Sequence, residues 1–142
     1  MSRASVAFSQ ALLAKSSLDR GDLAAAEYWA QTCGYERSKH LHFLNEYDHM
    51  VLARVQHAQG KFQEARATLE RLRPFTIAMG RNGRVIEIYL ILAQVLQSLG
   101  SQDEALLNLE QALVLGMPEG FVRTFIDEGG AIENLLMRMR KS

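Results

Sequence analysis

The sequence has few proline and cysteine residues and no long apolar run. Only Pro74 and Pro118 among its 142 residues are proline, which leaves long stretches free to be helical. Cys33 is the single cysteine, so an internal disulfide is excluded and a reducing, cytoplasmic compartment is favoured. No apolar run approaches the roughly 20 residues that span a bilayer, and the N-terminus lacks the apolar core of a signal peptide. We therefore expect no membrane partner.

The sequence also lacks an excess of charge and any recognisable catalytic motif. It has 16 basic and 16 acidic residues, whereas domains that bind nucleic acid through phosphates usually show a basic excess. A nucleophile elbow, paired catalytic carboxylates and a glycine-rich phosphate loop are all missing. We therefore expect no enzymatic activity, no catalytic residue, no cofactor and no direct contact between this chain and nucleic acid.

What the sequence does contain is one short module in three copies. Each copy has a Leu-Ala pair, a glycine seven residues after that alanine, and a second alanine five residues after the glycine. The copies are Leu13-Ala14…Gly21…Ala26, Leu52-Ala53…Gly60…Ala65 and Leu92-Ala93…Gly100…Ala105. Because glycine accepts the left-handed conformation at a helix C-terminus, each copy predicts a helix, a glycine turn and a second helix.

The predicted fold is all-α, a TPR-like α-α superhelix of three helical hairpins plus a short C-terminal helix pair. We expect a single domain with repeats at about 4–34, 43–79 and 84–116, and capping helices at about 119–140. Asp22 is expected to cap the second helix, and the third helix is expected to begin near Leu41. Pro74 predicts a kink or a break in the fourth helix. The fifth helix, from about Arg84 to Leu99, is the most apolar and is expected to be the most buried.

These copies resemble tetratricopeptide repeats, in which small residues lie where the two helices of a hairpin cross. Larger side chains at those positions would force the helices apart. In this sequence the small residues are Ala14, Ala53 and Ala93 in the first helices and Ala26, Ala65 and Ala105 in the second helices. The period of 39 to 40 residues is longer than the 34 of the family, so the helices or links are extended.

The C-terminal part of the sequence makes the family resemblance more specific. The phrase PEGFVRTFIDEG, from Pro118 to Gly129, is followed by the pair Leu135-Leu136. It resembles the end of the helical-repeat sensor domain in MalT-type regulators of the LuxR family. The resemblance implies an effector-sensing or protein-interaction domain of a bacterial transcriptional regulator. Because neither a phosphate loop nor a helix-turn-helix is present, we expect this chain to be a part of a larger regulator, without its ATPase and DNA-binding domains, or else a stand-alone relative of the sensor domain.

The resemblance also implies a concave groove lined by the first helix of each hairpin, in which a small-molecule inducer or a regulatory protein binds. The candidate groove residues are Lys15, Tyr47, Met50, Arg54, His57, Glu87, Gln94 and Gln97. An ordinary solvated helix face is the alternative for each of them. A second hypothesis is a scaffold that binds a peptide of a partner protein, although Asp19 replaces the asparagine expected beside Lys15 in a carboxylate clamp. Self-association through an open end is also possible.

Two charged clusters complete the candidates. Arg71, Arg73, Arg81 and Arg84 could meet a phosphate or an acidic partner, or form a solvated end of the hairpin. His42, Glu46 and His49 share one face if they lie on one helix, and such side chains can bind zinc. One helix face seldom completes a metal site, so we expect a solvated cluster in the first case and no metal in the second.

Overall fold

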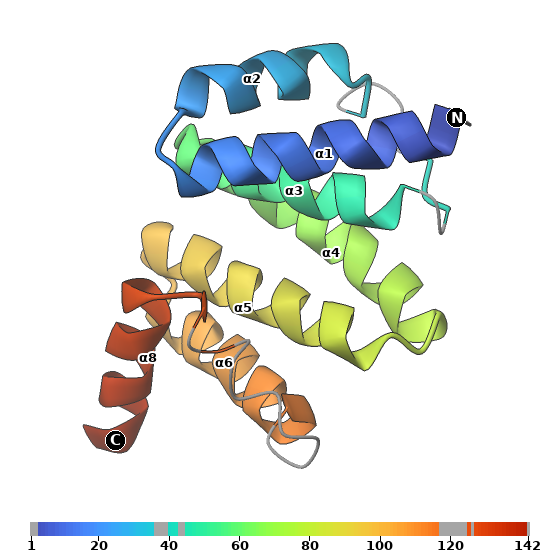
Figure 1. Ribbon diagram of the computed structural model, residues 1–142. Coiled ribbons are helices and arrows are strands. Elements are labelled where there is room, and N and C mark those ends of the chain that lie inside the picture. The colour runs from blue at the N-terminus through green and yellow to red at the C-terminus, as the bar shows by residue number, and fades with distance from the viewer. Residues whose placement is uncertain (1–2, 36–39, 43–44, 117–124, 126, 142) are drawn as a thin grey trace. The chain divides into compact units, whose positions relative to one another are not determined.

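The computed structural model describes residues 3–35, 40–42, 45–116, 125 and 127–141, with side chains from residue 10 to residue 138. Within this part of the chain the regular structure is entirely helical (Figure 1). The helices are α1 (Arg3–Asp19), α2 (Leu23–Thr32), α3 (Glu46–Ala58), α4 (Phe62–Ala78), α5 (Asn82–Ser98), α6 (Gln102–Gly116) and α8 (Gly130–Lys141). The predicted all-α fold is confirmed. The expected helix around Phe121 lies largely outside the described residues.

The chain divides into two compact units, residues 1–72 and 73–142, so that the division falls within α4. In the first unit α1 packs against α2 and α3, and α2 also contacts α3. In the second unit α5 packs against α6 along its length, and α8 contacts both. This packing of sequential helices is that of a helical-repeat superhelix. None of the described helices is long and apolar enough to cross a membrane.

The glycine turns have the same geometry in all three copies of the module. Gly21, Gly60 and Gly100 have φ angles of 81°, 80° and 81°, in the left-handed region that other residues rarely enter. At the first turn the Gly21 N–H donates to the Leu18 carbonyl at 3.0 Å, and the Asp22 N–H donates to the Ser17 carbonyl at 2.8 Å. The same two hydrogen bonds recur at the other two turns, which satisfies carbonyls that the helix end would leave unpaired.

The six alanines of the module are all buried, as close helix crossings at these positions require. Their exposed fractions are 4% for Ala14 and 0% for the other five. A similar close approach occurs in the second unit at Gly116, where a Cβ atom would lie 2.7 Å from the Phe125 ring. The short side chains therefore allow the helices and the chain after α6 to approach closely.

Three predictions about helix ends can be compared with the structure. The Asp22 cap is confirmed, since its side chain accepts a hydrogen bond from the Ala25 N–H at 3.3 Å. The predicted start of the third helix was wrong, because α3 begins at Glu46. The Asn45 side chain instead accepts from the His42 N–H at 3.0 Å and donates to the His40 carbonyl at 2.9 Å. These local bonds compete with a helix before residue 45.

A kink or a break was expected at Pro74, and the break is absent, since α4 is continuous from Phe62 to Ala78. Proline removes the hydrogen bond to the carbonyl four residues earlier, that of Glu70. Both Pro74 and Glu70 are exposed, so water can bind that carbonyl. At the C-terminus, α8 buries Ile132 and Leu135 as the apolar pattern of the tail predicts.

Candidate functional site

The first helices of the second and third hairpins bury the same number of residues but differ in chemistry. α3 and α5 each have nine buried residues, so the expectation that α5 is the most buried helix was wrong. Those of α5 are all apolar. Those of α3 include four polar residues: Glu46, Asp48, His49 and Gln56.

The repeat gives each of these polar residues a counterpart forty positions later. The counterparts are Ile86, Ile88, Tyr89 and Leu96, respectively. Burying a polar group costs free energy unless it is fully hydrogen-bonded. Since the third copy forms the same hairpin with apolar residues, the fold does not require the polar ones. Sequences depart from the locally favourable choice mainly at functional or strained sites, which makes this part of α3 the candidate site.

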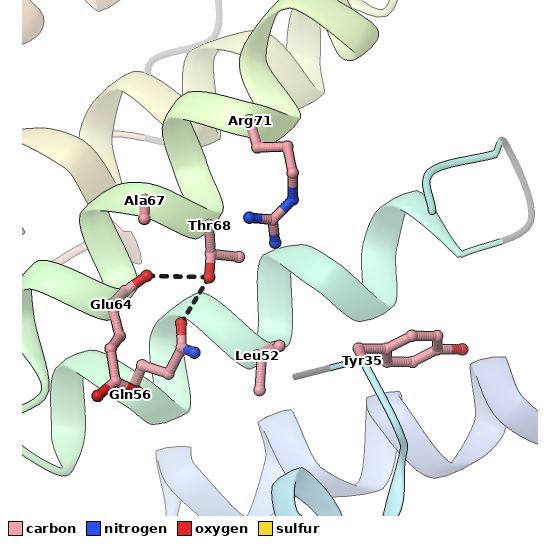
Figure 2. Close-up of a pocket in the computed structure, with 7 residues that line it drawn as sticks. All are labelled: Tyr35, Leu52, Gln56, Glu64, Ala67, Thr68 and Arg71. Atoms are coloured by element: carbon pink, nitrogen blue, oxygen red, sulfur yellow. Dashed lines mark hydrogen bonds between the residues drawn. The ribbon is translucent and has the colours of Figure 1, made fainter. Parts of the chain in front are cut away.

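Asp48, His49, Leu52 and Gln56 lie on one face of α3, at helical spacings. From α4, the Thr68 hydroxyl lies 2.8 Å from Gln56 Oε1 and 3.0 Å from the Glu64 carbonyl oxygen (Figure 2). A hydroxyl has one proton, so these two acceptors share it. Thr68 is therefore satisfied within its own helix even without Gln56.

Tyr35 reaches this face from the segment after α2. Gly34, with a φ of 84°, turns the chain there. The Tyr35 hydroxyl donates to Asp48 Oδ2 at 2.7 Å, and its ring lies against the His49 ring with the centroids 4.7 Å apart. Two contacts thus hold Tyr35 as a fixed wall beside α3.

A pocket of about 290 Å³ lies between these elements. Its lining residues are Tyr35, Leu52, Gln56, Glu64, Ala67, Thr68 and Arg71 (Figure 2). The guanidinium of Arg71 extends from α4 toward α3 on one side of the Gln56–Thr68 hydrogen bond, and the Glu64 side chain lies on the other side. Ala67 leaves space that its counterpart in the third copy, Leu107, would partly fill.

Some buried polar atoms in and beside the pocket have no hydrogen-bond partner among the described residues. They are Arg71 Nε and Asp48 Oδ1. Buried polar atoms in folded proteins usually have a partner, and each exception needs an explanation. Arg71 belongs to the pocket lining, and Asp48 is hydrogen-bonded to a second lining residue, Tyr35, which fits a site that is completed by a ligand.

Burial dominates the electrostatics of this cluster. The pKa of His49 is lowered to about 4, chiefly by burial and then by the Arg71 charge, although a hydrogen bond with the His40 backbone raises it in part. Burial also raises the pKa of Asp48, and its hydrogen bond from Tyr35 only partly counteracts this. The pKa of Tyr35 is raised by burial and by the Asp48 contact. His49 and Tyr35 are therefore neutral at pH 7, and Arg71 is the cation of the pocket.

The groove residues predicted on α3 lie on the other side of that helix from the pocket. Tyr47, Arg54 and His57 are half-buried, and Met50 is only 1% exposed. These four are spaced so that they face away from Leu52 and Gln56, at 100° per residue. Burial lowers the pKa of His57, with a further contribution from the Arg54 charge. The predicted groove face and the pocket are thus opposite faces of the same helix.

Lys15, from α1, forms an ion pair with Asp19 at 2.7 Å rather than extending away from its helix. In the second unit, Glu87, Gln94 and Gln97 are half-buried on α5. The Gln94 side chain donates to Glu128 Oε2 at 2.7 Å, so part of this predicted surface contacts the chain after α6.

In the fold, the members of each of the two charged clusters do not stay together. Arg71 lines the pocket of the first unit, whereas Arg73 lies over the Tyr89 ring of the second unit, 5.8 Å from its centroid. His42 precedes α3 and therefore does not share a helix face with His49. Across the described part of the chain, no group of three histidine, cysteine or acidic residues is placed to hold a metal ion.

Sequence reasoning missed Tyr35, Gln56, Thr68 and Glu64, and it assigned Arg71 to a solvated end. A signal was present in the repeat itself. Aligning the second and third copies at their glycines shows polar residues in α3 opposite three aliphatic residues and a tyrosine in α5, a contrast that marks this face without any structure.

One comparison with known proteins gives a match. A family model described as the MalT-like TPR region matches residues 2–142. No curated protein and no solved structure matches the chain.

Proposed function

The chain belongs to the family of MalT-like TPR regions, and from this membership we propose that it is the effector-sensing region of a LuxR-family transcriptional regulator. In this proposal the ATPase and DNA-binding domains of the regulator lie outside the present sequence. The chain contacts an effector, and it acts in the cytoplasm without direct contact to nucleic acid or membrane.

The observation that carries the sensing function is the polar pocket between α3 and α4. Small-molecule sites are concave, with an apolar floor and a few convergent polar groups. Leu52 forms such a floor, and Gln56, Thr68 and Arg71 provide the polar groups. The guanidinium of Arg71, which lines the pocket, is a cationic donor that suits an anionic acceptor.

The inferred mechanism is a shift between conformations of the regulator. An effector can change an equilibrium only if it binds one state more tightly than the other. The pocket draws its walls from Tyr35, α3 and α4, so its shape depends on how α4 packs against α3. A ligand that fits one packing of this hairpin would favour that packing and alter the contacts that the sensor makes with the rest of the regulator.

A scaffold that binds a partner's peptide is the alternative function, and no structural feature favours it over the sensor. Lys15, the residue suited to a carboxylate clamp, is paired with Asp19. Helical repeats generally act as binding scaffolds, so either function assigns no reaction to the chain. A regulatory protein or a second copy of the chain as the effector would leave the pocket empty.

Two observations test the proposal. The gene should encode an ATP-binding module and a helix-turn-helix in the same reading frame, and a stand-alone gene would contradict the regulator assignment. A thermal-shift screen of the chain against sugars, nucleotides and short peptides should find a class that raises the unfolding temperature. Loss of this shift in Ala67→Leu, which narrows the pocket, would place the effector there; a shift that only Arg54→Ala and His57→Ala abolish would place it on the opposite face of α3.

A further inference from the structure

The pocket between α3 and α4 has one charge of each sign, at opposite ends. Glu64 and Arg71 both lie on α4, seven residues apart, which is about 10 Å along the helix axis. Figure 2 shows their side chains on opposite sides of the Gln56–Thr68 pair. Glu64 is exposed at the rim, whereas Arg71 is half-buried with Nε fully enclosed. A ligand that satisfies both groups must have an anionic and a cationic end that are separated.

Neutral groups lie between the two charges. The amide oxygen of Gln56 faces the Thr68 hydroxyl at 2.8 Å, and its amide nitrogen points toward Leu52. A side-chain amide pairs well with a peptide group, since each offers a donor and an acceptor. Leu52 and Ala67 add apolar surface that suits small aliphatic side chains.

The volume limits the size of the ligand. The pocket, at about 290 Å³, lies at the lower end of the range for ligand sites, about 300–1,000 Å³. A small ligand therefore fills the pocket, whereas a nucleotide or an oligosaccharide would extend out of it past the exposed Glu64.

We propose that the α3–α4 pocket binds a short zwitterion of the dipeptide type, with its carboxylate on Arg71, its ammonium group on Glu64 and its peptide group on Gln56. This inference rests on the proposed sensing function and specifies the effector. An α-amino acid is a weaker ligand, because its two charges are adjacent and cannot reach both ends of the pocket.

The test is calorimetric titration of the complete chain with alanyl-alanine and with two blocked forms, the N-acetylated dipeptide and the dipeptide amide. Alanyl-alanine should bind with a measurable Kd, and each blocked form should bind at least tenfold more weakly. Equal binding of all three would overturn the assignment of the charged ends, and tighter binding of free alanine would overturn the assignment of the spacing.

Matched variants locate the site. Arg71→Gln and Glu64→Gln should each weaken dipeptide binding at least tenfold. Their controls are Arg66→Gln, which removes from the same helix a cation that pairs with Glu70, and Glu104→Gln, which alters the counterpart of Glu64 in the first turn of α6. Both controls should bind as the wild type does. If the controls lose binding as much as the pocket variants do, the effect is general electrostatics and the site is wrong.

The outcomes separate this inference from the proposed function. If a sugar or a nucleotide binds and alanyl-alanine does not, the dipeptide assignment is wrong while the sensing function stands. If no compound binds the folded chain, both fail. Circular dichroism of each variant shows whether the chain remains helical, and Arg71→Lys provides a milder change that keeps the charge but loses the planar, two-pronged donor.

Discussion

The α3–α4 and α5–α6 hairpins are two copies of one module with different interiors. They share the glycine turn, the crossing alanines and the same pair of hydrogen bonds at the helix end. The α5–α6 hairpin fills its interior with aliphatic residues such as Ile86, Leu90 and Leu109. The α3–α4 hairpin places Asp48, His49 and Gln56 at buried positions and leaves a pocket.

This difference teaches which residues serve the fold and which do not. A feature that both hairpins share is needed to make the module, whereas a costly feature that only one hairpin has requires another reason. Natural proteins often retain destabilising polar groups where activity needs them. We therefore propose that the polar interior of the α3–α4 hairpin serves ligand binding rather than folding.

The largest effect is expected when the apolar hairpin receives a polar residue. Leu96→Gln introduces into α5 the residue that α3 has at this position, Gln56. Leu96 is 2% exposed, so the change removes apolar burial and buries an amide. The free energy of unfolding should fall by about 2–4 kcal/mol, measured by urea denaturation. A loss below about 0.5 kcal/mol would show that the two hairpins tolerate polarity equally.

The second prediction concerns how stability depends on pH. The buried His49 should make this dependence a property of the α3–α4 hairpin. The folded pKa of His49 is about 4 against an ordinary 6.5, so the unfolded chain binds more protons between these values and stability falls as the pH is lowered through them. His49→Gln introduces the residue of the first copy, Gln10, and removes this dependence. Between pH 7.5 and 5 the variant should lose about 2 kcal/mol less stability than the wild type.

Asp48 and His57 titrate in both proteins, so their contributions cancel to first order in this difference. The raised pKa of Asp48 acts in the opposite direction, since the folded state then takes up a proton as the pH falls. Parallel stability curves for the two proteins would show that His49 is not the desolvated base described above.

The third prediction is that the turns do not differ. Gly60→Ala and Gly100→Ala should each reduce stability by about 1 kcal/mol, because alanine is strained at a positive φ. No atom lies within 4 Å of a Cβ added at either position, so conformation alone sets the cost. Gly130→Ala, in a helix with open space around it, is the control and should not destabilise the protein. Unequal losses of stability in the two variants would show that the turns contribute to the difference between the hairpins.

The shared part of the hairpins was predictable from the sequence because its causes are local. Gly60 and Gly100 set the turn, and Ala65 and Ala105 set the crossing through their size. The local rule that proline breaks a helix failed at Pro74. Solvent around this residue allows α4 to continue past it.

The pocket could not be predicted in the same way. It depends on Tyr35 reaching Asp48 across 13 residues of sequence and on the α3–α4 contact between Gln56 and Thr68. Helical spacing shows that residues share a face, but not which face lies over a cavity. The predicted groove on α3, which includes Arg54 and His57, remains a prediction, and the pocket lies on the opposite side of that helix.

The most direct test of the central claim is the stability of Gln56→Leu, which gives α3 the residue found at the same position of α5. Thr68 keeps its hydrogen bond to the Glu64 carbonyl, and leucine adds apolar burial. The free energy of unfolding, measured by urea denaturation at pH 7, should stay unchanged or rise by up to about 1 kcal/mol. A loss of about 2 kcal/mol or more would contradict the account, because it would show that Gln56 is needed for the fold.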